Sequence, residues 1–294
     1  MKEFLKNAAQ GFSMALADSV PGLSGGTVAF VLGFYDKFIN SLNTLISRNG
    51  DKKEAIKFLI KLGCGWVIGM AIASLILSNL FETHIYQVSS LFIGFIIFAI
   101  PLIIKEEKEN VKGKYKNLLF TIIGIVIVSA ITYFNSQTGN GANIDITNLN
   151  LGLVLYVFVA GMIAISAMIL PGISGSTLLL IFGLYMPIIT GIKETLHFNL
   201  AYIPVLFVFG LGILAGIALI IKAVKKALEK YRSQTIYLII GLMIGSIYAI
   251  IMGATTLKIP QAPLSLKTFN IICFAIGGLI IFGMEFAKRK LENK

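Results

Sequence analysis

The chain has 294 residues, of which 56% are hydrophobic and only 13% are charged, and its formal net charge is +11. Soluble domains carry about 25% charged residues, so this composition excludes an ordinary soluble domain and predicts an all-α polytopic membrane protein. The positive charge does not require nucleic acid as a partner, because lysines and arginines collect on the cytoplasmic side of membrane proteins. We therefore expect membrane lipids, and no nucleic acid, around this chain.

The first predicted element is a broken apolar hairpin over residues 3–46. Its first half is amphipathic and too short to span a bilayer. Pro21-Gly22 interrupts the segment and Ser24-Gly25-Gly26-Thr27 restarts it, because Pro and Gly break helices and Ser caps them. Irregular backbone at membrane depth is tolerated only where it is buried in protein or faces water. The pattern therefore favours a re-entrant hairpin.

The remainder of the first half, to residue 134, contains three apolar segments that are long enough to span a bilayer. We expect spans at 58–80, 87–104 and 118–134, with a short loop holding Glu82 and His84 between the first two. Residues 135–150 lack Lys and Arg and are rich in Asn and Gly, which is typical of a turn-rich loop. We interpret this segment as an extracytoplasmic linker.

The second half, residues 151–294, repeats this plan. A second broken hairpin is expected over residues 151–192, and further spans are expected at 199–221, 235–254 and 269–287. From Gly11/Gly161 onward, ten of 31 aligned positions are identical at a constant offset of 150 residues. The restart reads Pro171-Gly172-Ile173-Ser174-Gly175-Ser176-Thr177. The chain therefore consists of two repeats.

Charge predicts that the two repeats have opposite orientations in the membrane. Each repeat has three spans, an odd number, plus a hairpin that returns to its starting side. If the amino terminus is cytoplasmic, 22 of the 25 basic residues lie in cytoplasmic segments, as the positive-inside bias requires. The parity is the same if both halves of the second hairpin span fully. Both termini are therefore expected in the cytoplasm.

Inverted repeats with interrupted helices are typical of secondary transporters, whose half-helix N-termini meet anionic substrates near the midplane. The two hairpin tips would approach each other there, and helix starts suit phosphate or carboxylate. The alternative is that these small residues only form a tight helix crossing. The predicted phosphate-binding residues are Ser24, Gly25, Gly26, Thr27, Ser174, Gly175, Ser176 and Thr177, with helix breaks at Pro21, Gly22, Pro171 and Gly172.

Asp18 lies at membrane depth just before the first tip, where its counterpart in the second repeat is Met168. An ionisable residue there is a functional candidate, so Asp18 is the predicted site for coupling to a proton or Na⁺. The alternative is that Asp18 caps the restarting helix. His84 and His197 are far apart in sequence and Cys64 and Cys273 form no CxxC pair, so we expect no metal site and no cofactor.

The two motifs resemble those of the bacterial polyprenyl-phosphate transporter family. The first motif is Ala17-Asp18-Ser19-Val20-Pro21-Gly22-Leu23-Ser24-Gly25-Gly26-Thr27, and the second is Ser166-Ala167-Met168-Ile169-Leu170-Pro171-Gly172-Ile173-Ser174-Gly175-Ser176. The likeness spans nearly the whole chain. It implies a plasma-membrane flippase that returns undecaprenyl phosphate from the outer to the inner leaflet, where the lipid is reused for cell-wall synthesis.

Other functions are compatible with the same motifs. A secondary transporter or channel for a small anion would use the same tips, and a sideways opening toward lipid would distinguish the lipid carrier from it. A lipid phosphatase would need a nucleophile with acid and base partners. No histidine or carboxylate cluster lies near either motif, so an enzyme is not expected. Assembly into a homo-oligomer is a further option for a protein of this kind.

Overall fold

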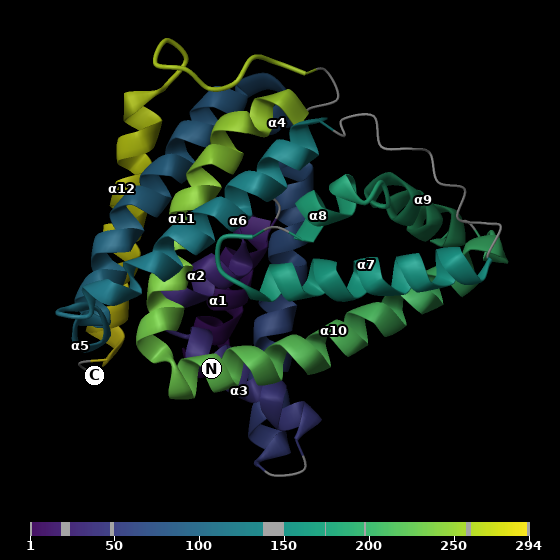
Figure 1. The fold of residues 1–294 in the computed structure, drawn as a ribbon, viewed down its shortest axis with the longest axis horizontal. Coiled ribbons are helices and arrows are strands. Elements are labelled where there is room, and N and C mark those ends of the chain that lie inside the picture. Colours follow the sequence, from purple (N-terminus) through teal and green to yellow (C-terminus); the bar gives the residue numbers. More distant parts are fainter. Residues whose placement is uncertain are drawn as a thin grey trace.

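The computed structural model describes residues 2–18, 24–47, 50–137, 150–173, 175–196, 198–256 and 260–292. All regular structure in these ranges is helical (Figure 1). Six of the described helical segments are long and apolar enough to cross a membrane. The predicted class of an all-α polytopic membrane protein is therefore confirmed.

Each predicted hairpin contains three helices rather than two. The first consists of α1 (Lys2–Asp18), α2 (Gly25–Val31) and α3 (Tyr35–Ile46). The additional break lies at Gly33, whose φ of 71° is favourable only for glycine. There the N–H of Phe34 bonds to the carbonyl of Ala29 at 3.0 Å, which closes the end of α2 in the manner of a helix C-cap.

The second hairpin is built in the same way, from α7 (Leu151–Ile169), α8 (Gly175–Ile181) and α9 (Tyr185–Leu196). Gly183 has a φ of 64°, and the N–H of Leu184 bonds to the carbonyl of Leu179 at 2.9 Å. These positions follow those of the first hairpin by 150 residues. Helix α7 by itself is long and apolar enough to cross a membrane.

The loop expected between residues 80 and 87 is absent. The backbone is helical throughout α4 (Lys52–Glu106), apart from one non-helical residue, His84, with φ −135° and ψ 35°. Figure 1 shows α4 rising from beside α3 to the upper end of the view and descending to α5 (Lys108–Val111). A sharp bend at one residue thus replaces the expected loop, and the two expected spans fall within the two arms of α4.

The remaining helices follow the expected order with shifted ends. They are α6 (Leu118–Gln137), α10 (Ile203–Lys230), α11 (Arg232–Met252) and α12 (Ile271–Glu292), with 3-10 turns at Tyr115–Asn117, Leu200–Tyr202 and Gly253–Thr256. Helix α10 extends well past the expected end at residue 221, whereas the apolar part of α12 is short, Ile271–Gly283. Most of the predicted linker, residues 138–149, lies outside the described residues.

Close helix packing is duplicated between the two halves. A Cβ atom on Gly65 of α4 would collide with the carbonyl of Ala8 in α1, and one on Gly212 of α10 would collide with the carbonyl of Phe158 in α7. Between the halves, Gly94 of α4 packs in this way on α12, and Gly241 of α11 packs on α6. Small residues allow backbones to approach this closely within a membrane, so each half of the chain uses the same contacts.

Large apolar side chains cover much of the outer surface. Val67, Phe207 and Leu279 are 61%, 65% and 68% exposed, while core residues such as Ile96 and Met243 are fully buried. Exposed apolar area on this scale marks a surface that contacts lipid or protein. In Figure 1, α1 begins and α12 ends at the lower end of the view, where α5 also lies.

Candidate functional site

The two tips are in direct contact near the centre of the molecule. The N–H of Gly172 donates a 2.8 Å hydrogen bond to Thr27 Oγ1, which belongs to the first repeat. The hydroxyl of Ser24 lies 3.2 Å from the carbonyl oxygens of Met168 and Leu170. Ser24 and Thr27 are only 1% and 2% exposed. The structure thus brings together the described parts of the two motifs, which are about 150 residues apart in sequence.

Ser24 caps α2 as its sequence pattern predicts. Its backbone is extended, with φ −134° and ψ 138°, and its Oγ accepts a 3.1 Å hydrogen bond from the N–H of Gly26. Only glycine fits at position 26, because a Cβ on Gly26 would lie 2.7 Å from the carbonyl oxygen of Ile169. The cap and the glycine together let the start of α2 abut the end of α7.

Asp18 ends α1 and uses both of its oxygens. Oδ1 accepts a 2.6 Å hydrogen bond from the N–H of Gly25, and Oδ2 accepts one of 2.9 Å from the indole N–H of Trp66. The carboxylate is therefore placed as a cap on α2, which is the alternative role that its sequence position suggests. Because Gly25 and Gly26 donate to Asp18 and Ser24, an anion can reach these two N–H groups only if those acceptors move.

The second tip is buried where it is described. Pro171, Gly172 and Ile173 are all buried, and Gly172 has a φ of 88°. A Cβ on Gly172 would lie 2.6 Å from the backbone of Leu242 in α11, so both its conformation and its contact require glycine. Pro21, Gly22, Ser174 and the side chains of Ser176 and Thr177 lie outside the described residues.

A lateral apolar pocket of about 340 Å³ adjoins this junction. Its walls come from α1, α3, α4 and α7, and so from both repeats. Nearly all of its lining is aliphatic or aromatic, and its polar groups are those of Asp18 and Trp66. We call this cavity the lateral pocket.

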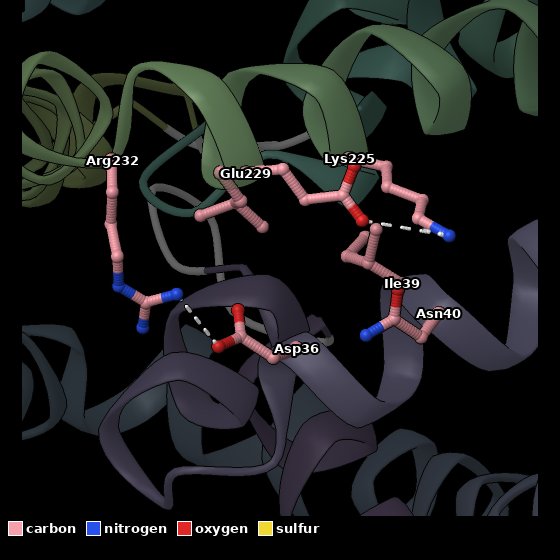
Figure 2. A pocket seen from close by; sticks show the side chains of 7 residues that line it. Asp36, Ile39, Asn40, Lys225, Glu229 and Arg232 are labelled. Atoms are coloured by element: carbon pink, nitrogen blue, oxygen red, sulfur yellow. Dashed lines mark hydrogen bonds and ion pairs between the residues drawn. The ribbon is translucent and has the colours of Figure 1, made fainter.

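A second pocket of about 330 Å³ lies between α3 and the end of α10 (Figure 2). Asn40 lines it from α3, and Arg232 lines it from the start of α11. Lys225 and Glu229 of α10 pair at 3.7 Å along its other side. Five of its seven lining residues are polar or charged, and they carry both signs of charge.

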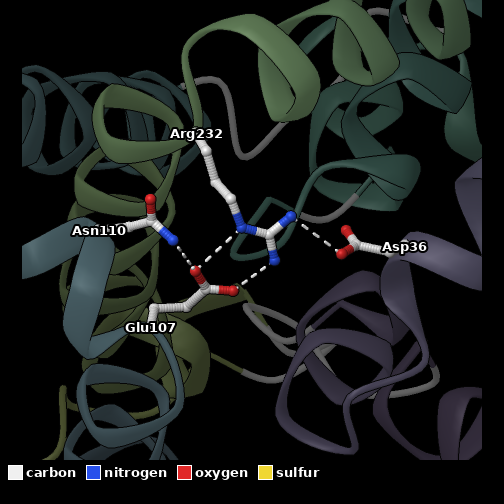
Figure 3. Close-up of polar contacts among 4 residues, drawn as sticks. All are labelled: Asp36, Glu107, Asn110 and Arg232. Atoms are coloured by element: carbon white, nitrogen blue, oxygen red, sulfur yellow. Dashed lines mark hydrogen bonds and ion pairs between the residues drawn. The ribbon is translucent and has the colours of Figure 1, made fainter.

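Arg232 holds the two halves of the chain together at this end (Figure 3). Its guanidinium donates to both carboxylate oxygens of Glu107, and its Nη1 lies 3.1 Å from Oδ2 of Asp36. Asn110 donates a further hydrogen bond of 2.8 Å to Glu107. A planar guanidinium suits such a two-pronged contact. We call Asp36, Glu107 and Arg232 the ionic latch.

The charge of Glu107 is maintained by its partners. Burial raises the pKa of its carboxyl, but the hydrogen bonds from Arg232 and Asn110 and the guanidinium charge outweigh burial, so the pKa lies below its ordinary value of 4.5. The Glu107 side chain is 13% exposed and that of Arg232 35%. This shielding from water strengthens the ion pair relative to one on an open surface.

A small cavity of about 140 Å³ joins the latch to the C-terminal end of α2 and is lined by Phe30, Gly33 and Tyr35 as well as by latch residues. Tyr35 is buried, and its hydroxyl donates a 3.1 Å hydrogen bond to the carbonyl of Ile169 in the second tip. The seven residues of α2, about 10 Å of helix, thus run from the junction to the small cavity beside the latch.

Proteins of one family are similar to this chain over most of its length. A family model described as undecaprenyl phosphate translocase-like matches residues 14–268. This chain belongs to that family. It is 36% identical over 250 residues to a protein of Staphylococcus aureus (strain NCTC 8325 / PS 47) named polyprenyl-phosphate transporter, covering 85% of this chain and 87% of that protein.

A second relative carries the same name. It comes from Vibrio cholerae serotype O1 (strain ATCC 39315 / El Tor Inaba N16961) and is 30% identical over 258 residues, covering 83% of this chain and 76% of that protein. No solved structure matches this member of the translocase-like family. The resemblance drawn from the two motifs is therefore confirmed, and the names of family and relatives indicate a transporter.

Four polar residues of this family member have partners that its sequence did not reveal. The indole N–H of Trp66 donates to Asp18. Asp36, Glu107 and Arg232 form the latch across separations of 125 and 196 residues. Two features of the sequence point to these residues: Arg232 is one of only three arginines, and Asp36 falls inside an apolar hairpin. Among the residues described, no three His, Cys, Asp or Glu side chains gather as a metal site.

Proposed function

We propose that this protein transports polyprenyl phosphate, returning undecaprenyl phosphate from the outer to the inner leaflet of the bacterial plasma membrane by alternating access. The names of its family and of both relatives support the substrate. The single observation that carries the proposal is the contact between the two tips, marked by the 2.8 Å bond from Gly172 to Thr27, which adjoins the apolar lateral pocket.

A charged head group loses its hydration if it crosses hydrocarbon unaided, at a cost of many kcal/mol. The tip junction offers polar groups at the centre of the bundle, while the lateral pocket is almost entirely apolar. A lipid with a phosphate head needs both surroundings at once. A small inorganic anion needs only the first, so the lateral pocket favours the lipid over the rival substrate.

The proposed head-group site lies between the two tips, at residues 24–27 and 174–177. Asp18 now accepts from the N–H of Gly25, so the carboxylate and a phosphate would compete for one position at the start of α2. Neutralising Asp18 with a proton, or pairing it with Na⁺, would weaken its hold on this amide. In this proposal Asp18 couples ion movement to the binding of phosphate.

We propose that the ionic latch closes the transport path on the side away from the tip junction. Arg232 at the start of α11 ties the second repeat to Asp36 and Glu107 of the first. The termini and most basic segments are proposed to face the cytoplasm, which places the latch at that surface. Access from the cytoplasm would then require these ion pairs to separate, as one repeat moves against the other.

Leaflet exchange in vesicles tests the proposal. The purified protein is reconstituted with labelled undecaprenyl phosphate, and an external phosphatase attacks the head groups that face outward. Without exchange, the lipid of the inner leaflet stays protected, whereas transport exposes nearly all of it. Vesicles loaded with chloride, assayed in parallel, report the rival small-anion activity.

Two substitutions locate the site within this assay. Ser24→Leu and Ser174→Leu are expected to stop exchange, whereas Ser13→Leu is the matched control because the Ser13 hydroxyl makes an exposed hydrogen bond to the carbonyl of Ala9 within its own helix, away from the tips. Full protection of the inner leaflet by wild-type protein would reject lipid transport. Unchanged exchange in both tip variants would reject the head-group site alone.

A further inference from the structure

We propose that the lateral pocket binds the isoprenoid chain of the lipid, at the isoprene units that adjoin its phosphate. This inference rests on the proposed function, and it adds a specific place for the hydrocarbon part of the substrate. The pocket has a volume of about 340 Å³ and is formed where α1, α3 and α4 of the first repeat meet α7 of the second.

The wall formed by α4 leaves room for a ligand and carries an exposed apolar side chain. Gly63 lines the pocket, and a Cβ built on it meets nothing within 4 Å. Val67, one turn further along the same wall, is 61% exposed. Both residues lie in the part of α4, Lys52–Ala73, that is long and apolar enough to span a bilayer. A hydrocarbon chain can therefore enter sideways without leaving the lipid phase.

The inner end of the pocket leads to the tip junction. Met168 and Ile169 line the pocket, and the carbonyl of Met168 also lies within hydrogen-bonding distance of the Ser24 hydroxyl. Asp18 and Trp66 form the polar end of the same cavity. A chain lying in the pocket would thus hold its head group beside the junction while its far units remain in lipid.

The pocket suits an isoprenoid chain better than a straight acyl chain. An isoprenoid carries a methyl branch on every unit and is wider than an acyl chain. The open space at Gly63 gives the wall a hollow that can take such branches, and dispersion contacts are lost where a void stays unfilled. The isoprenoid chain is therefore the proposed occupant, and phospholipid acyl chains are the competitor to be tested.

Trp66 makes the pocket directly observable, because it is the sole tryptophan of the chain and lines the cavity. Its fluorescence is recorded in detergent during titration with undecaprenyl phosphate, with dioleoyl phosphatidic acid and with inorganic phosphate. The lipid phosphate is expected to shift the emission saturably. Phosphatidic acid has the same kind of head group on acyl chains, and it should bind at least about tenfold more weakly.

Two glycines provide a variant and a matched control. Gly63→Leu would fill the hollow, whereas Gly210→Leu introduces the same side chain at the corresponding position of α10, which is equally open. Gly63→Leu is expected to weaken binding at least about tenfold and Gly210→Leu less than about twofold. A photoreactive prenyl phosphate, cross-linked to wild-type protein and mapped by mass spectrometry, should label residues 59–67 or 165–169.

The outcomes separate this inference from the proposed function. If wild-type protein exchanges the lipid between leaflets but the cross-links map elsewhere, the lateral pocket is not the chain site. Equal binding by phosphatidic acid would also overturn the inference, as would unaltered binding in Gly63→Leu. Should Gly63→Leu fail to fold, the wild-type cross-link map decides. Failure of leaflet exchange itself would instead remove the proposed function.

Discussion

The Thr27 hydroxyl and the backbone N–H of Gly172 are 2.8 Å apart, although 145 residues separate them in sequence. This bond is buried and joins the two halves of the chain at their most similar segments. A donor that loses its partner in such a place has no water to replace it. The junction is therefore both a structural contact and the proposed place of the substrate head group.

Replacing Thr27 tests the strength of this junction. Thr27→Val keeps the shape of the side chain but leaves the N–H of Gly172 without an acceptor, so we expect a loss of about 1–3 kcal/mol in the free energy of unfolding. Thr27→Ser retains the hydroxyl and should lose less than half as much. Thermal unfolding in detergent measures both variants. Equal stability of Thr27→Val and wild type would show that the bond contributes nothing.

Asp18→Asn distinguishes a structural cap from a coupling site. The amide replaces one of the two acceptor oxygens with an NH2 donor, which would face the N–H of either Gly25 or Trp66, so we expect altered Trp66 fluorescence and slower exchange. If Asp18 also carries the coupling ion, the variant should lose the dependence of exchange on imposed proton or Na⁺ gradients. A variant that exchanges lipid more slowly but keeps that dependence would leave Asp18 as a cap only.

Glu107→Gln should weaken the ionic latch in a pH-dependent way. Removing the charge is expected to lower the free energy of unfolding by about 1–3 kcal/mol at neutral pH. The pKa of Glu107 lies below 4.5 in the folded protein, so its contribution is complete above that value and is lost as the pH falls through the folded pKa. The difference between wild type and variant should therefore shrink in acid.

Glu229 provides the control when the free energies of unfolding of wild type and Glu107→Gln are measured against pH. Its side chain is 62% exposed and it pairs with Lys225 within α10 at 3.7 Å. Exposed pairs of this kind contribute about 0–1 kcal/mol, so Glu229→Gln should unfold almost as wild type does at every pH. An equal effect of the two substitutions would mean that Glu107 does not act through a shielded ion pair.

Gly65→Ala and Gly212→Ala test the duplicated packing. Each added methyl would meet a backbone carbonyl of the neighbouring helix, and backbone cannot yield as a side chain does, so both variants should lose about 1–3 kcal/mol. Gly210→Ala meets nothing within 4 Å and should be neutral or slightly stabilising, because Ala favours helix. Denaturation in detergent with parallel measurements of expression provides the comparison.

The sequence by itself determined where most helices lie and the order in which they follow one another. Pro-Gly followed by Ser-Gly interrupts a helix and caps the next one through bonds between near neighbours, so Ser24 was correctly placed as the start of α2. The apolar segments predicted most of the described spans for the same reason. The second break in each hairpin, at Gly33 and Gly183, was missed, because a glycine can also lie within a helix and its positive φ appears only in three dimensions.

The tertiary structure alone decided which polar groups meet. Asp18 pairs with Trp66 across 48 residues, and Arg232 with Asp36 across 196. No local pattern encodes such partners, because they depend on how whole helices pack. Packing also decided that the N–H groups of Gly25 and Gly26 have acceptors within the protein. Helix formation follows from short-range hydrogen bonds that a sequence displays, whereas the surroundings of a charge follow from long-range contacts that it does not.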